Sequence, residues 1–156
     1  MGINPGLRSE ALGHHFAGKG NPFWRLLHAS GLLPTPLSFA EDRRLADFGF
    51  ALTNVAPRAT RQASELSRSE LKKGYAVLER KIRRLKPRVV VFTGVTIYRQ
   101  FFPQSPSPGA GLKPELVGGA RVFVLPNPSG LNASYPGFRQ KLVWFKKLRR
   151  FLDRAN

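Results

Sequence analysis

The chain has 156 residues, and its 26 Lys and Arg against 9 Asp and Glu give a formal net charge of +17. A chain of this length can bury one substantial hydrophobic core, so we expect a single domain over residues 1–156. Cysteine is absent, which excludes disulfides, iron–sulfur clusters, thiolate zinc sites and cysteine nucleophiles. The sequence shows neither a signal peptide nor an apolar run long enough to span a membrane. We therefore expect an intracellular protein, in the cytoplasm or the nucleoid.

The excess of positive charge predicts a polyanionic partner. Nucleic acid is the first candidate, and an anionic membrane surface is the second. The acidic residues form no D-x-D or E-x-x-H pattern, so the carboxylate cluster that two-metal phosphodiester chemistry requires is not visible. This pattern argues against a nuclease or a polymerase.

Metal and nucleotide sites are also not indicated. His14 and His15 are adjacent and His28 is distant, a spacing that does not suggest a metal site. The segment 13–20 nearly matches a phosphate-binding loop, but Gly20 stands where that loop needs Ser or Thr for magnesium. We expect no metal and no cofactor.

The first part of the chain predicts few regular elements. Residues 1–20 are expected to be a loop, because glycine and proline interrupt them. A helix is predicted to begin at Asn21 and Pro22, with Asn as the cap and Pro at the first helical position, and to end at Gly31. Three short elements are then expected: a Pro-rich turn over 32–39, a short helix over 40–47 and a strand over 50–55.

The strongest local pattern predicts a helix over 67–86. Ser67 and Glu70 form a capping box at its start. An apolar stripe follows at helical spacing, made of Leu71, Tyr75, Leu78, Ile82 and Leu85. Pro87 ends the helix.

The second half of the chain alternates strands with helices. Residues 89–92 form a continuous apolar run, typical of a strand buried on both faces of a parallel sheet. The elements expected after it are a helix over 95–102, a Pro/Gly loop over 103–119, a strand over 121–125 and a helix over 137–153. This order predicts an α/β fold with a short, mostly parallel sheet. Because ligands bind at the carboxyl ends of such strands, we expect a site built from the loop over 9–20 and the loops after Val55 and Leu125.

Two Asn-Pro segments are candidates for that site. They are Gly2-Ile-Asn-Pro-Gly6 and Asn127-Pro-Ser-Gly-Leu-Asn132. Glycine lets a backbone approach a ligand closely and proline stiffens the loop. Two ordinary turns are the alternative interpretation.

With these segments the chain resembles the mismatch-specific uracil/thymine DNA glycosylases of the uracil-DNA glycosylase superfamily. The other matching motifs are GHHF at 13–16, GNPFW at 20–24, TNV at 53–55, PRAT at 57–60 and FTG at 92–94. The resemblance covers nearly the whole chain and implies a three-layer α/β/α fold. It implies an enzyme that flips uracil, thymine or a modified pyrimidine out of a mismatch with guanine. Hydrolysis of the N-glycosidic bond then leaves an abasic site.

The resemblance also implies the partner. It is double-stranded DNA that carries a mismatched or damaged pyrimidine, with no role for a membrane, and we expect a monomer. The match places no lysine as a Schiff-base nucleophile, so we expect a monofunctional glycosylase without lyase activity. Which bases the pocket accepts and which base it prefers opposite them are open.

The resemblance assigns roles around the base pocket. Asn4 would position the attacking water, and the backbone around Ile3 and Phe16 would supply electrostatic stabilisation. Phe16 would stack on the flipped base, with core packing as the alternative. Asn54 would contact the edge of the base, and Ser9 a phosphate of the flipped nucleotide.

A second group of residues is expected to contact the rest of the duplex. Leu131 would be the wedge that fills the gap left by the flipped nucleotide. Gly130 and Asn132 would contact the opposite guanine, and Ser129 a phosphate.

One departure from the family pattern concerns the start of the fold. The GINPG loop should leave the end of a central strand, yet only Met1 precedes Gly2. We therefore expect the first strand to be missing, which would leave backbone groups of its neighbours unpaired. Two alternatives to the glycosylase stay open: a nucleic-acid-binding relative that keeps the pocket without turnover, and a basic RNA- or ribosome-associated protein.

Overall fold

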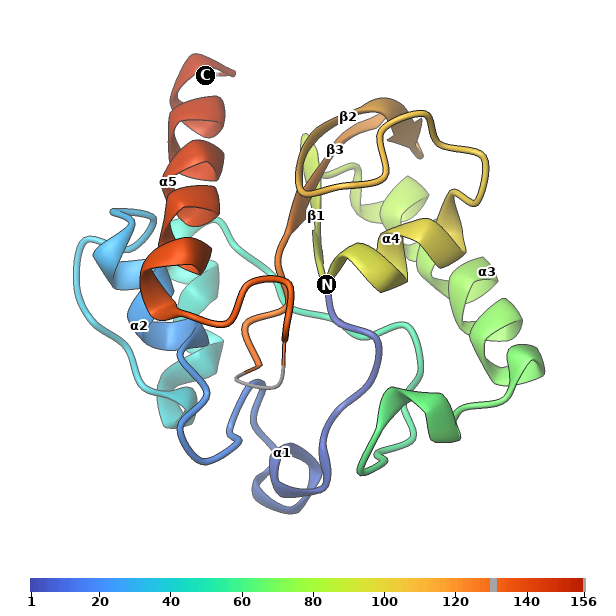
Figure 1. The fold of residues 1–156 in the computed structure, drawn as a ribbon, viewed down its shortest axis with the longest axis horizontal. Helices are drawn as coiled ribbons and strands as arrows, with labels where there is room; N and C mark the ends of the chain where they lie inside the picture. Colours follow the sequence, from blue (N-terminus) through green and yellow to red (C-terminus); the bar gives the residue numbers. More distant parts are fainter. Residues whose placement is uncertain (130–131, 156) are drawn as a thin grey trace.

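A three-stranded sheet lies between two layers of helices in the computed structural model, which describes residues 1–129 and 132–155. Helices α2 and α5 cover one face, and α3 and α4 cover the other (Figure 1). The helices are α1 (Leu7–Leu12), α2 (Phe23–Ala29), α3 (Arg68–Leu85), α4 (Val95–Phe101) and α5 (Phe138–Arg154). The 3₁₀ helices are η1 (Phe39–Phe48) and η2 (Ala63–Glu65), and the strands are β1 (Val89–Thr93), β2 (Gly111–Val117) and β3 (Ala120–Leu125). The α/β class and the three layers are as expected from the sequence.

The sheet is mixed. Its strand order is β1-β3-β2, with β1 parallel to β3 and β2 antiparallel to β3. Val89 lies opposite Arg121 and Thr93 opposite Leu125. The carboxyl ends of the two parallel strands therefore meet at one edge of the sheet.

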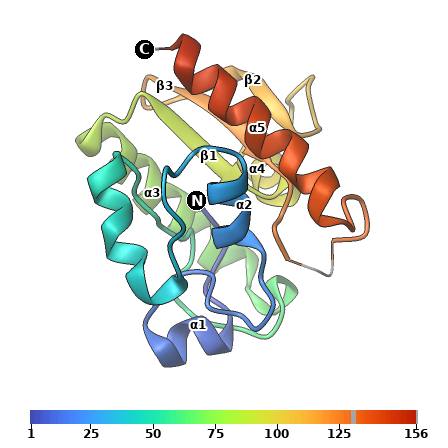
Figure 2. The ribbon, with the colours of Figure 1, turned by 90° about the vertical axis from the view of Figure 1, so that its left-hand side faces the viewer.

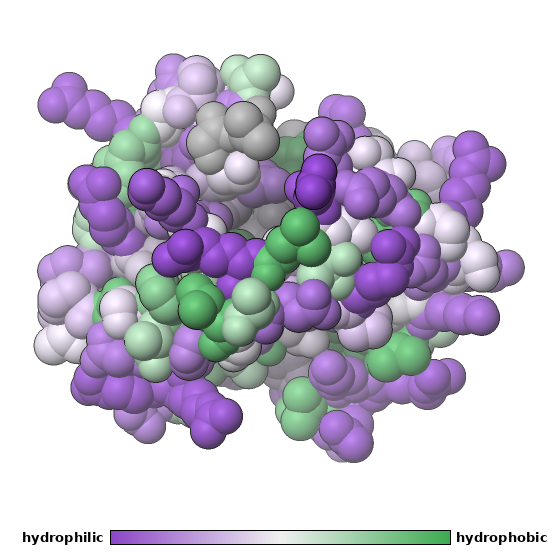
Figure 3. Space-filling view, turned by 90° about the horizontal axis from the view of Figure 1, so that it is seen from below, coloured by the Kyte–Doolittle hydropathy of each residue, from purple (hydrophilic) through white to green (hydrophobic). Residues whose placement is uncertain are grey.

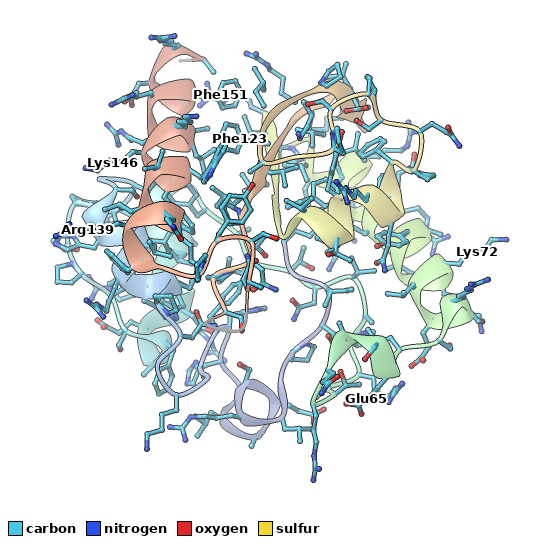
Figure 4. The ribbon with its side chains drawn as sticks, in the orientation of Figure 1. Glu65, Lys72, Phe123, Arg139, Lys146 and Phe151 are labelled. Carbon is cyan, nitrogen blue, oxygen red and sulfur yellow. The ribbon has the colours of Figure 1, made fainter. Side chains whose placement is uncertain are left out.

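Side chains alternate between two cores, one on each face of the sheet. Val90 and Phe92 of β1 pack with α3 and α4, while Val89 and Val91 face α2 and α5. On the second face Phe123 of β3 stacks against Phe151 of α5 at 5.7 Å between ring centres (Figure 4). Figure 2 shows α5 crossing the sheet on this side. Burial on both faces explains the continuous apolar run of β1.

Helix α3 begins as the capping box predicts. The Ser67 hydroxyl accepts a hydrogen bond from the Glu70 N–H, and the Glu70 carboxylate accepts one from the Ser67 N–H. Leu78 and Ile82 of the predicted apolar stripe are buried, but its last residue, Leu85, is 61% exposed. Gly118 of the β2–β3 turn packs on Ile82, and Leu85 lies nearly one turn further along the helix. Helix α2 forms where it was predicted, but the predicted cap is wrong: Pro22 is the N-cap, and Asn21 accepts a hydrogen bond from the Phe23 N–H just before the helix.

Three sequence predictions need correction. The expected loop over 1–20 contains the short helix α1. The expected loop over 103–119 contains β2, whose central Pro114 argues against a strand by sequence but is tolerated because β2 lies at the sheet edge beside a register irregularity. The expected strand over 50–55 forms only one bridge, from Asn54 to Gly2. A ladder needs a neighbour along its length, and only the first three residues lie beside this segment.

Those first three residues continue the sheet past β1. The Met1 amine donates to the Val91 carbonyl at 2.8 Å, and the Met1 carbonyl accepts from the Thr93 N–H and hydroxyl, each at 2.8 Å. On the other side Gly2 exchanges hydrogen bonds with residues 53–55. Of the strand that the resemblance places before Gly2, the described chain holds only this short paired stretch.

No helix in the described ranges has the length and hydropathy that a membrane crossing requires.

In a chain that starts at Met1, the buried amine predicts a pH dependence of stability. Burial lowers its pKa from about 8 to about 5. Between pH 5 and pH 8 the unfolded chain therefore binds a proton that the folded chain does not, so the free energy of unfolding should rise with pH by up to about 1.4 kcal/mol per unit. Urea unfolding at several pH values measures this slope.

Acetylation of Met1 supplies the matched control for that measurement. The acetylated chain keeps an N–H for the Val91 carbonyl but has no titrating amine. Between pH 5 and pH 8 its free energy of unfolding should rise less steeply with pH, by the contribution of this one proton. Equal slopes in the acetylated and unacetylated chains would contradict the prediction.

A close contact at Gly74 predicts the effect of a second change. A Cβ built at Gly74 would lie 2.4 Å from the Val55 carbonyl oxygen, a backbone atom. Alanine normally stabilises a helix by about 1 kcal/mol over glycine, but here the overlap should outweigh that gain. Gly74→Ala should lower the free energy of unfolding by about 1–3 kcal/mol. In the same denaturation experiment the exposed neighbour change Lys73→Ala should stay within about 0.5 kcal/mol of the parent.

Candidate active site

A cavity of about 1130 Å³ opens where β1 and β3 end. Its lining includes Thr93 and Gly94 at the end of β1 and Asn127 in the loop after β3. Residues 2–6, near the start of the chain, also line it. Figure 3 views the molecule from this end and shows hydrophilic side chains around its rim. The cavity thus lies at the strand edge where the sequence placed a site.

The predicted site residues that the structure describes all line this one cavity. They are Ile3, Asn4, Ser9, Phe16, Asn54, Ser129 and Asn132. The remaining two, Gly130 and Leu131, lie outside the described residues. Residues far apart in the sequence are thereby brought together by the ends of neighbouring strands.

The side-chain amide of Asn4 is held in one orientation. Its Nδ2 donates to the Arg58 carbonyl at 2.9 Å and to the Thr60 hydroxyl oxygen at 2.7 Å. The Thr60 hydroxyl itself donates to the Gln62 carbonyl at 2.8 Å, so it accepts from Asn4. Both amide protons of Asn4 are then used, and its carbonyl oxygen Oδ1 is left as an acceptor.

Thr60 was not predicted as a site residue, although it lies within the quoted PRAT motif. It is 4% exposed and lines the cavity. Its backbone is tied to the Asn4 loop as well, since Gly6 and Thr60 form a parallel bridge and the Thr60 N–H donates to the Pro5 carbonyl. The sequence signal was weak because a threonine in a loop has many ordinary uses.

Asn54 stands against the Gly2 backbone. A Cβ at Gly2 would lie 2.8 Å from the Asn54 Oδ1 atom. Only glycine at position 2 lets the Asn54 amide keep this place at the cavity wall. The Lys81 ammonium fixes the preceding residue by donating to the Thr53 hydroxyl at 3.0 Å.

Phe16 packs against the core, which was one of the two alternatives, and it also lines the cavity. Its ring stacks on the core residue Phe23, with 3.8 Å between ring centres. Its φ of 53° is in the left-handed region, which is unusual for a residue with a side chain. The surrounding loop must therefore hold this conformation.

Hydrogen bonds to Asp42 and Ser9 supply that support. The Asp42 carboxylate accepts from the His15 N–H at 3.0 Å and lies 3.1 Å from the His14 ring nitrogen Nδ1. Burial raises the Asp42 pKa, but these hydrogen bonds outweigh it and the pKa lies below its ordinary value. The Ala17 N–H donates to the Ser9 hydroxyl oxygen at 3.0 Å. Ser9 is thus bound to the loop that carries Phe16, and its hydroxyl proton remains available to a ligand.

The loop after β3 forms an Asx turn at its start. The Asn127 side-chain oxygen accepts from the Ser129 N–H at 2.9 Å, and the Asn132 amide donates to the Asn127 carbonyl at 3.1 Å. Asn127 thereby fixes both predicted duplex-contact residues that the structure describes. The Asn-Pro motif in the sequence does not by itself indicate this role for Asn127.

The electrostatics of the cavity are unusual for a hydrolytic site. Its described lining contains Arg61 and Arg99 but no Asp, Glu or Lys. His14 and His15 also line the cavity, and burial lowers the His15 pKa. Within residues 1–129 and 132–155 no three His, Asp or Glu side chains form a group that could hold a metal ion. Any water activated here must be oriented mainly by neutral hydrogen-bonding groups.

Comparison with known families gives a match over nearly the whole chain. The family model described as Uracil DNA glycosylase superfamily matches residues 1–152. The matched range contains every residue of the cavity lining.

Proposed function

The chain belongs to the uracil DNA glycosylase superfamily, and we propose that it is a DNA repair glycosylase that removes uracil from a mismatch with guanine. Superfamily membership implies glycosylase activity on uracil-like bases in DNA. The fixed amide of Asn4 in the cavity is the observation that carries the proposal for this chain. We treat residues 1–156 as one glycosylase domain and propose that it works as a monomer.

The proposed reaction breaks the bond between the base and the anomeric carbon of deoxyribose. A water molecule donates one proton in a hydrogen bond to Asn4 Oδ1, which turns its lone pair toward the anomeric carbon. An amide is too weak a base to remove the proton early, so the bond to the base breaks first and the sugar gains oxocarbenium character. The base leaves as an anion with the bonding electron pair; water then adds to the anomeric carbon, and the proton it releases goes to the departed base, which gives the neutral base and the abasic sugar. Asn4 contributes by placing the water rather than by base catalysis.

The base would enter the cavity by flipping out of the duplex. Phe16 stacks on Phe23, and the neighbouring residue His15 donates its N–H to the Asp42 carboxylate. The Phe16 ring is thereby held in place and offers an aromatic surface on which the base can stack. The Asn54 amide can both donate and accept, which suits the edge of a pyrimidine. The Ser9 hydroxyl can donate to a phosphate of the flipped nucleotide.

The loop after β3 is proposed to contact the duplex. Ser129 would meet a phosphate and Asn132 the guanine opposite the flipped base. Gly130 and Leu131, for which a backbone contact and the wedge are proposed, lie outside the described residues.

We propose a monofunctional enzyme without lyase activity. Schiff-base chemistry needs an amine near the sugar, and the described lining of the cavity includes no lysine. The buried Lys141, whose pKa burial lowers, lies in the first turn of α5 and is not part of that lining. A relative that binds nucleic acid without turnover is the alternative, because the cavity also lacks a strong base.

Replacement of Asn4 tests the function directly. Asn4→Ala should lower single-turnover base release from a duplex with one G·U pair by at least about 100-fold, because the water loses its acceptor. Duplex affinity should change little. Alkali-treated and untreated samples are compared on a gel, and strand breaks in the untreated sample would contradict the monofunctional proposal.

The matched control removes an amide outside the cavity. Gln104 is exposed and is not part of the described lining, so Gln104→Ala should release base at the parent rate. A folded parent protein that binds the duplex but releases no base would favour the binding-only alternative. Parallel substrates with G·T, A·U and single-stranded U would define the base range.

Replacement of Thr60 tests the positioning of Asn4. Thr60→Val keeps the shape but removes the acceptor for Asn4 Nδ2, so the amide can rotate. Base release should slow about tenfold or more at saturating enzyme, with duplex affinity unchanged. Thr60→Ser keeps the hydroxyl and should restore most of the rate. Equal losses in the Val and Ser variants would show that only packing matters at this position.

A further inference from the structure

The end of the molecule opposite the cavity carries a dense positive charge. The link from α3 to β1 is short, so the last turns of α3 lie beside the start of β1. Arg121 at the start of β3 stacks over Phe151 near the end of α5, at 4.5 Å, which brings the end of α5 to the same side (Figure 1). We name the cations there the far-end patch: Arg80, Arg83, Arg84, Lys86, Arg88, Arg121, Arg149, Arg150 and Arg154.

Few carboxylates oppose this charge. In the described segments 79–88, 118–121 and 149–155 the acidic residues are Glu79 and Asp153. Glu79 pairs with Arg83 at 2.7 Å, and Asp153 pairs with Arg149 at 2.9 Å. The patch therefore keeps a large excess of positive charge, which an anionic partner would neutralise.

A hollow within the patch suits phosphate groups. Its volume is about 460 Å³, and it is lined by Arg83, Lys86, Pro87, Arg88, Gly118 and Gly119. Gly118 and Gly119 form the β2–β3 turn with positive φ values of 56° and 86°. Gly118 packs against Ile82 and Arg83 of α3, whereas a Cβ at Gly119 would meet nothing within 4 Å, so the backbone is open to a close approach at Gly119 while the surrounding cations supply charge.

The hollow and the catalytic cavity cannot serve one straight duplex. They share no lining residue, and strand β1 separates them: Arg88 precedes it, and Gly94 follows it. At about 3.3 Å per residue the two sites are roughly 20 Å apart, at opposite ends of the sheet. A duplex whose base enters the cavity leaves the far-end patch facing away from it.

We propose that the far-end patch binds the phosphate backbone of a second DNA segment, so that one protein molecule bridges two segments. The inference rests on the proposed function only for the first segment, at the cavity. Every patch residue except Lys86 is arginine, whose planar fork matches phosphate oxygens. Insertion into a membrane surface takes a broad apolar face, whereas the large apolar side chains exposed beside the patch are two single residues, Leu85 and Leu116, the second opposite Arg121 in the sheet.

The test is a bridging assay with a matched control variant. Protein is bound to a lesion-free duplex on beads, and capture of a second, fluorescent lesion-free duplex is measured over a range of salt. The test variant combines Arg84→Gln with Lys86→Gln. The control combines Lys72→Gln with Lys73→Gln, which removes the same charge from exposed positions nearer the start of α3 (Figure 4).

The parent protein and the control should capture the second duplex, and the test variant should capture at least about tenfold less. For the test variant, the slope of log affinity for the second duplex against log salt concentration should be shallower by roughly 1.8, since each lost phosphate contact removes about 0.9 from the slope. Base release from a short G·U duplex should be the same in all three proteins. Thermal unfolding of each checks that the variants are folded.

Other outcomes would overturn the inference. These are equal capture by the parent and the test variant, equal losses in both variants, and loss of anionic-vesicle binding with DNA capture intact. A parent protein that bridges duplexes through the patch but releases no base would leave this site standing and would instead reject the proposed glycosylase.

Discussion

The pairing of the first three residues on both sides is the constraint on which the site depends. Met1 is hydrogen-bonded to β1, and Gly2 and Ile3 are hydrogen-bonded to residues 53–56. Because these neighbours run parallel, their loops emerge at one edge and bring Asn4 and Asn54 to one cavity. Each of these hydrogen bonds is backbone-directed, so the arrangement depends on the path of the chain more than on side-chain identity.

Helix α3 supports the same segment from the other side. Gly74 allows the helix to approach the Val55 carbonyl, and the Lys81 ammonium reaches the Thr53 hydroxyl. The glycine in the middle of a helix weakens it locally, but here it lets the segment that carries Asn54 pack closely. Stability and site geometry are therefore coupled, and a larger residue at position 74 should disturb both.

Patterns of burial were predictable, and partners in space were not. The capping box of α3 and the apolar run of β1 depend on neighbours in the sequence, and both elements form where expected. The prediction of a strand over 50–55 was wrong because a strand needs a neighbouring strand to pair with, and the apolar pattern of the sequence does not show whether one is present. Strand β2 was missed because Pro114 is acceptable only at an edge, and edge position is a property of the whole sheet.

The same distinction applies to the candidate site. The loops that line the cavity follow from the α/β rule, and Asn4, Phe16 and Asn54 come from recognisable motifs. Thr60 and Asp42 act through hydrogen bonds to other residues, and their partners lie 56 and 28 positions away in the sequence. Contacts with residues so distant in the sequence leave no local sequence pattern, so only the folded structure reveals them.

The charge of the cavity limits how the proposed reaction can proceed. Arg61 and Arg99 favour the departing base as it gains negative charge, but they disfavour positive charge on the sugar. No carboxylate in the described lining offsets that second effect. Asp42 is hydrogen-bonded to His14 and His15 and is not part of the lining, so the negative charges that face the sugar would be the phosphates of the DNA itself. In this mechanism the substrate supplies the charge that the protein lacks, and the protein supplies the geometry through Asn4 and Thr60.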